Sequence, residues 1–72
     1  MQTIPEALKA RALRILDLSR NRPVSEQMRA CAVSARACAR AAQLEGDAES
    51  FARHMHTAAK FAHLAEMRET VH

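Results

Sequence analysis

Residues 28–47 have the sequence MRACAVSARACARAAQLEGD, and this stretch decides the fold. Apolar residues, most of them small, recur in it at intervals of three and four positions: Met28, Cys31, Ala35, Cys38 and Ala42. This rhythm is typical of a helix that packs along its length against other helices. Small side chains also allow a second helix to come close. We therefore expect these five residues, the small-residue seam, to form a helix-packing or oligomer interface.

A shorter helix is predicted before this stretch. Thr3 is a suitable N-cap residue, and Glu6, three positions later, completes the pattern of a capping box. Apolar residues then follow a helical period, which predicts a helix over about residues 4–20. Pro23 disfavours helical backbone at the preceding residue, so the chain should turn there.

The second and third helices are predicted to form a hairpin. Ser25 is the expected cap of the second helix, which we place over about residues 25–45. Gly46 is the only glycine, and it stands where a helix C-terminus needs a left-handed residue. Asp47 can cap a third helix over about 47–69 at once. The short turn predicts that the third helix folds back antiparallel on the second.

The expected fold is therefore all-α, with a short N-terminal helix and an antiparallel helical hairpin in one domain over residues 1–72. A chain of this length buries only ~60% of its unfolded surface, which leaves a lone monomer marginal. Alanine supplies much of the 49% apolar content, and alanine buries little area. We expect dimerisation to complete the bundle, with Phe51 and Met55 of the third helix adding large side chains to the interface.

Charge is distributed unevenly along the chain, whose net charge is +3. Residues 1–44 carry eight basic and three acidic side chains, a net charge of +5. Residues 45–72 carry three basic and five acidic side chains, a net charge of −2. A basic first part favours an acidic partner, either a protein surface or a nucleic acid, and it also suits self-association.

Four arginines form a candidate partner- or anion-binding strip: Arg22, Arg29, Arg36 and Arg40. Arginine can hold carboxylates or phosphates through two parallel hydrogen bonds. The alternative is an ordinary solvated helix face, and the sequence leaves both interpretations open. Only two aromatic residues occur, which offers no base-stacking platform. We therefore favour an acidic protein surface, with a small DNA-binding regulator as the alternative.

Two cysteines and the histidines are the candidate metal ligands. Cys31 and Cys38 lie ~10 Å apart along one helix, too far for a disulfide between them. We expect them to be reduced, buried and structural, packing as small apolar residues. A thiol-lined metal-binding bundle remains a third hypothesis. His56 and His63 are seven residues apart, whereas a helical zinc pair needs a spacing of four. We therefore predict no metal or other cofactor.

No combination of nucleophile, base and oxyanion donors is visible, so we expect no enzyme activity. The sequence shows no membrane-spanning run and no signal-peptide core, which favours a cytoplasmic protein. The favoured function is a small intracellular protein–protein interaction module, such as an adaptor, inhibitor or chaperone-like subunit. It would act by helix packing and a basic face, and we expect it to be a homo-oligomer.

Overall fold

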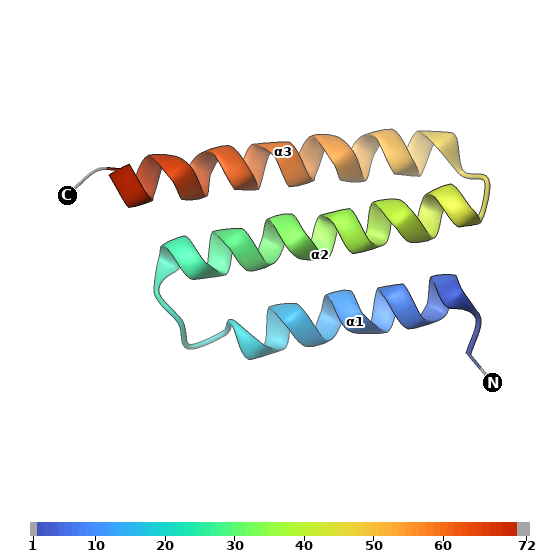
Figure 1. Cartoon of the computed structure of the whole chain (residues 1–72), viewed down its shortest axis with the longest axis horizontal. Helices are drawn as coiled ribbons and strands as arrows, with labels where there is room; N and C mark the ends of the chain where they lie inside the picture. The colour runs from blue at the N-terminus through green and yellow to red at the C-terminus, as the bar shows by residue number, and fades with distance from the viewer. Residues whose placement is uncertain (1, 71–72) are drawn as a thin grey trace.

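A computed structural model describes residues 2–70, which form three α-helices without a strand among them. Helix α1 spans Ile4–Leu18, α2 spans Val24–Leu44 and α3 spans Ala48–Thr70. The all-α class and the antiparallel pairing of α2 with α3 are thus confirmed (Figure 1).

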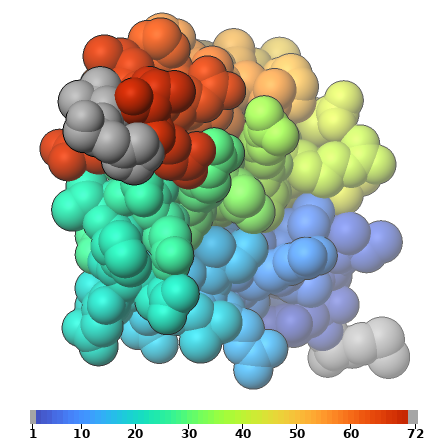
Figure 2. Space-filling model, turned by 60° about the vertical axis from the view of Figure 1, so that its left-hand side comes forward, coloured from blue at the N-terminus to red at the C-terminus, as the bar shows by residue number. Residues whose placement is uncertain are grey.

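The three helices lie side by side in a single layer. Helix α2 occupies the middle and contacts both neighbours, whereas α1 and α3 do not contact each other (Figure 1). The Cα atoms extend over 44 × 24 × 10 Å, so the molecule is a flat slab with two broad faces. In Figure 2, side chains of α2 reach the surface between α1 and α3. The middle helix is therefore covered at its two sides only.

The predicted N-cap residue is correct for α1 and wrong for α2. The Thr3 hydroxyl accepts a hydrogen bond of 3.2 Å from the Glu6 N–H, which confirms the predicted cap of α1. For α2 the expected Ser25 cap is wrong, because Pro23 occupies the N-cap position and no side chain caps the helix. Proline fixes φ near the value a helix start needs, so the helix begins at Val24 and includes Ser25 in its first turn.

Helix α1 also ends two residues earlier than predicted, at Leu18. Ser19 is responsible in part, because its hydroxyl donates a 2.8 Å hydrogen bond to the Leu16 carbonyl. Such side chain–backbone bonds compete with continuation of the helix. The Gln27 side chain then donates to the Arg20 carbonyl at 3.3 Å and ties the turn to the start of α2.

The turn between α2 and α3 follows the predicted chemistry. Gly46 has φ = 76°, the left-handed conformation that glycine adopts without strain. The Gly46 N–H donates to the Gln43 carbonyl at 3.1 Å and the Asp47 N–H to the Ala42 carbonyl at 2.9 Å, which together form a Schellman motif. Asp47 Oδ1 accepts from the Ser50 N–H at 3.0 Å and caps α3. These bonds to Ser50 lower the pKa of Asp47.

Alanine makes up the whole buried apolar core of residues 2–70. The buried residues of this kind are Ala12, Ala32, Ala35, Ala39, Ala41, Ala42, Ala58 and Ala65. Many larger apolar side chains are exposed instead: Ile4, Leu13, Leu16, Leu18, Val24, Val33, Leu44, Met55 and Met67. The core therefore brings backbones close together, and the layer leaves much of its large apolar surface in contact with solvent.

Candidate functional site

The small-residue seam of α2 faces a broad side of the layer rather than one neighbouring helix. Ala32 and Ala39 line hollows with residues of α3 and so lie on the α3 side. Ser34 and Ala41 follow Gln27, which lines a hollow with α1, by about two and four helical turns, so they lie on the α1 side. The seam lies between these two buried flanks. Its members differ in burial accordingly: Ala35 and Ala42 are buried, whereas Met28, Cys31 and Cys38 are half-buried. The seam is thus only partly covered within one chain.

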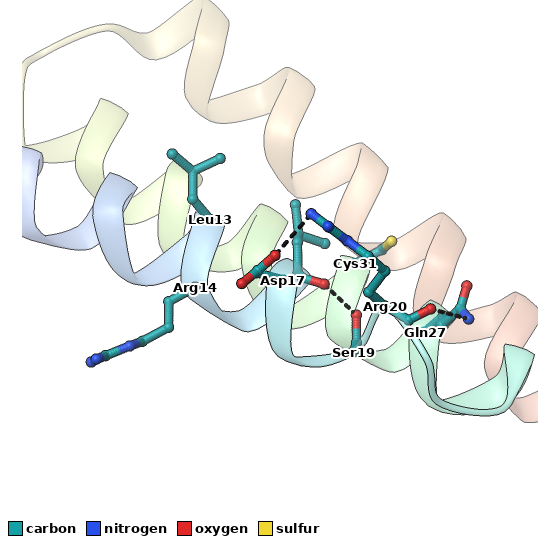
Figure 3. A pocket seen from close by; sticks show the side chains of 8 residues that line it. Leu13, Arg14, Asp17, Ser19, Arg20, Gln27 and Cys31 are labelled. Carbon is teal, nitrogen blue, oxygen red and sulfur yellow. Dashed lines mark hydrogen bonds and ion pairs between the residues drawn. The ribbon is translucent and has the colours of Figure 1, made fainter.

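Apolar side chains from α1 and α3 border the seam. Leu13 and Leu16 line a surface hollow together with Cys31, as Figure 3 shows for Leu13 and Cys31. On α3, His54 lines a hollow with Cys38 and Ala42 of the seam. Phe61 follows His54 by seven residues, which is two helical turns, and therefore lies on the same side of α3. We call this surface the cysteine face. It consists of the seam, Leu13 and Leu16 of α1, and Phe61 of α3 with Leu64, which lies beside Phe61 because it is three positions further along the helix.

One end of the cysteine face is polar. Lys9 forms a 3.0 Å ion pair with Glu45, which links α1 to the end of α2. The same end contains a hollow lined by both of these residues, Cys38 and His54. At the other end, the hollow around Cys31 and Leu13 is also bordered by polar side chains, among them the ion pair of Arg20 with Asp17 (Figure 3). The apolar part of the face therefore lies along its middle.

The two cysteines are free thiols. Both were expected to be buried, but each is only half-buried. The reason is the position of the seam, which neither neighbouring helix covers completely. No group of three or more Cys, His, Asp or Glu side chains within residues 2–70 is close enough to hold a metal ion. A donor set for a metal ion is therefore absent from the described residues of one chain.

Ion pairs interrupt the predicted arginine strip. Arg22 Nε lies 2.6 Å from the Glu26 carboxylate, and Arg29 forms two hydrogen bonds with Glu69 across α2 and α3. These contacts raise the pKa of both guanidinium groups, and the bond to Arg29 lowers the pKa of Glu69. Sequence spacing could not reveal the Glu69 contact, because the two residues are 40 positions apart. Two of the four arginines of the strip are thus paired with carboxylates of the same chain.

We call the broad face opposite the cysteine face the arginine face, because Arg36 and Arg40 lie on it. They line a groove between α2 and α3 whose other residues are Ala39, Gln43, Phe51 and Met55. Phe51 and Met55 were predicted to share an interface with the seam. The structure instead brings them together with the two arginines, because the α3 residues near Ala39 face away from the seam.

None of the helices described over residues 2–70 is long and apolar enough to cross a membrane. No protein-family model, curated protein or solved structure matches the chain significantly. The geometry of the two broad faces is therefore what a functional proposal must rest on.

Proposed function

We propose that this protein is a protein–protein interaction module that completes its helical layer on another helical surface. The observation that carries the proposal is the single layer with an all-alanine core. Helices normally bury their apolar stripes between two or more packed layers. Here the stripes of three helices meet no second layer, and large apolar side chains remain exposed.

A second copy of the chain is the partner that the cysteine face fits best. The Cα atoms of the layer extend over 44 × 24 Å, a projected area of about 1,000 Å² that is of the same order as the ~800 Å² of accessible surface buried per partner in a standard interface. Small residues along the middle of the face allow α2 of one copy to approach α2 of the other closely. Leucine and phenylalanine on both borders would supply the buried area that one chain lacks. The free thiols agree with a cytoplasmic setting.

The oligomeric state tests this proposal, and the chain offers a matched pair of variants. Leu13 and Leu18 belong to the same helix and have exposed fractions of 70% and 73%. Leu13 borders the cysteine face, whereas Leu18 lines a hollow with Ile15 on the other side of α1. Neither change should disturb the monomer fold, because both side chains are exposed.

We expect sedimentation equilibrium to show a dimer at micromolar concentration. Leu13→Gln should weaken that dimer, and Leu18→Gln should leave it unchanged. A stable 8.0 kDa monomer at high concentration would contradict the proposed assembly. Equal weakening by both variants would show that the cysteine face is not the surface used.

A further inference from the structure

The groove on the arginine face is formed by three pairs of residues, each pair one helical turn apart. On α2 these are Arg36 with Arg40 and Ala39 with Gln43, and on α3 they are Phe51 with Met55. Residues four positions apart lie above one another on a helix. The side chains along the groove therefore repeat at the same interval, one helical turn, as the side chains on one face of a bound helix.

Three of the six residues that line the groove are apolar: Ala39, Phe51 and Met55. Ala39 is only 1% exposed, so it lies at the bottom of the groove, where α2 and α3 pack closely. Phe51 is half-buried along one wall, and Met55 is 42% exposed beside it. Methionine adapts its shape to different apolar partners, a property common at binding surfaces. An apolar side chain entering the groove would be held by these two residues.

The rim of the groove is basic and has free hydrogen-bond donors. Arg36 makes no hydrogen bond or ion pair through its side chain within residues 2–70. Arg40 donates one 2.7 Å bond to the Gln43 side chain, and a guanidinium group has five N–H donors. No acidic side chain lines the groove. Its charge is therefore uncompensated at the place where its apolar surface is exposed.

We propose that this groove binds an acidic amphipathic helix of another protein. Apolar residues at i and i+4 of that helix would pack on Phe51 and Met55 in the groove along the α2–α3 boundary, and flanking carboxylates would pair with Arg36 and Arg40. Laying an amphipathic helix in an apolar groove is a common mode of peptide recognition. Charge-assisted hydrogen bonds to carboxylates supply specificity for acidic ligands. The inference rests on the proposed interaction function and adds an acidic partner at a site separate from the cysteine face.

The probe for the test is a fluorescein-labelled helical peptide with leucines four residues apart and glutamates beside them. A second peptide has lysine in place of each glutamate. Fluorescence anisotropy measures the binding of each peptide to the full chain and to its variants. Arg36→Gln/Arg40→Gln removes the basic rim and should keep its helicity, because glutamine forms helices nearly as well as arginine.

The control variant, Arg53→Gln/Lys60→Gln, removes the same charge from the opposite edge of α3. We expect the acidic peptide to bind the native chain, and Arg36→Gln/Arg40→Gln to weaken it about tenfold or more. The control should change binding less than about threefold, since distant exposed charges are screened. Met55→Gln should weaken binding at high salt, where the apolar contact dominates.

Equal weakening by the two double variants, or equal binding of the lysine peptide, would overturn the proposal. So would loss of self-association in Arg36→Gln/Arg40→Gln without any peptide, because the groove would then hold a second copy. Sedimentation of Leu13→Gln separates this inference from the proposed function. A dimer that depends on Leu13 while the acidic peptide fails to bind would refute the groove alone.

Discussion

Replacing Ala58 by leucine tests whether alanine fixes the distance between α2 and α3. Ala58 is 1% exposed, and the next residue, Ala59, is exposed on the same helix. Ala58→Leu and Ala59→Leu therefore add the same three carbon atoms. Ala58→Leu adds them at the interface between α2 and α3, and Ala59→Leu adds them in solvent.

Whether Ala58→Leu stabilises or destabilises the fold depends on the space around Ala58. If room existed, three more buried carbons would stabilise the fold by ~2 kcal/mol. If the helices are in close contact, the larger side chain must push α3 away from α2, which costs ~1–3 kcal/mol. An all-alanine core indicates close contact, so we expect a loss. At the exposed position the change should stay within about 0.5 kcal/mol.

Urea unfolding followed by circular dichroism measures both variants. The slope for a small domain is ~1 kcal/mol per molar urea, so Ala58→Leu should lower the midpoint by ~1–3 M. Each comparison needs one fixed protein concentration, because an oligomer gains stability by mass action. A midpoint for Ala58→Leu equal to or above that of Ala59→Leu would refute close packing as the role of the alanines.

Two further changes follow from the turn and from the ion pair between α2 and α3. Gly46→Ala should destabilise the fold by ~1–2 kcal/mol through its positive φ alone, since no atom lies within 4 Å of the added carbon. Gly46→Asn should destabilise the fold less than Gly46→Ala. Equal urea midpoints for the native chain and Gly46→Ala would contradict the predicted loss of stability. The lowered pKa of Glu69 means that its bond to Arg29 stabilises the protein above the ordinary glutamate pKa of about 4.3. The advantage of the native chain over Glu69→Gln should therefore shrink as the pH falls below that value, and a constant difference down to pH 2 would exclude the pair as its source.

Local signals in the sequence predicted the helices and the turn between α2 and α3 well. Gly46 and Asp47 act through bonds to residues within five positions, so their effect is visible without a structure. The start of α2 was misplaced because two adjacent signals competed, and the fixed φ of Pro23 took precedence over the hydroxyl of Ser25.

The arrangement of the faces was harder to predict than the helices. The spacing of the seam showed that one side of α2 is small and apolar, but periodicity alone does not say which helix covers it. Phe51 was expected to share an interface with the seam because its spacing places it on the apolar face of the third helix. Its true neighbours, Arg36 and Arg40, depend on how α3 is rotated about its axis. The contact of Arg29 with Glu69 depends on the same rotation, which no local signal encodes.

Because α1 and α3 do not contact each other, each outer helix is held only by its contacts with α2. Linear arrays of this kind open from their ends, one element at a time. Helix α1 has a single buried residue, Ala12, and is the weaker end. Amide hydrogens of α1 should exchange with solvent sooner than those in the middle of α2. Such opening would expose a new side of α2 while the α2–α3 hairpin stays folded, so the surface that a partner meets can change without unfolding of the whole molecule.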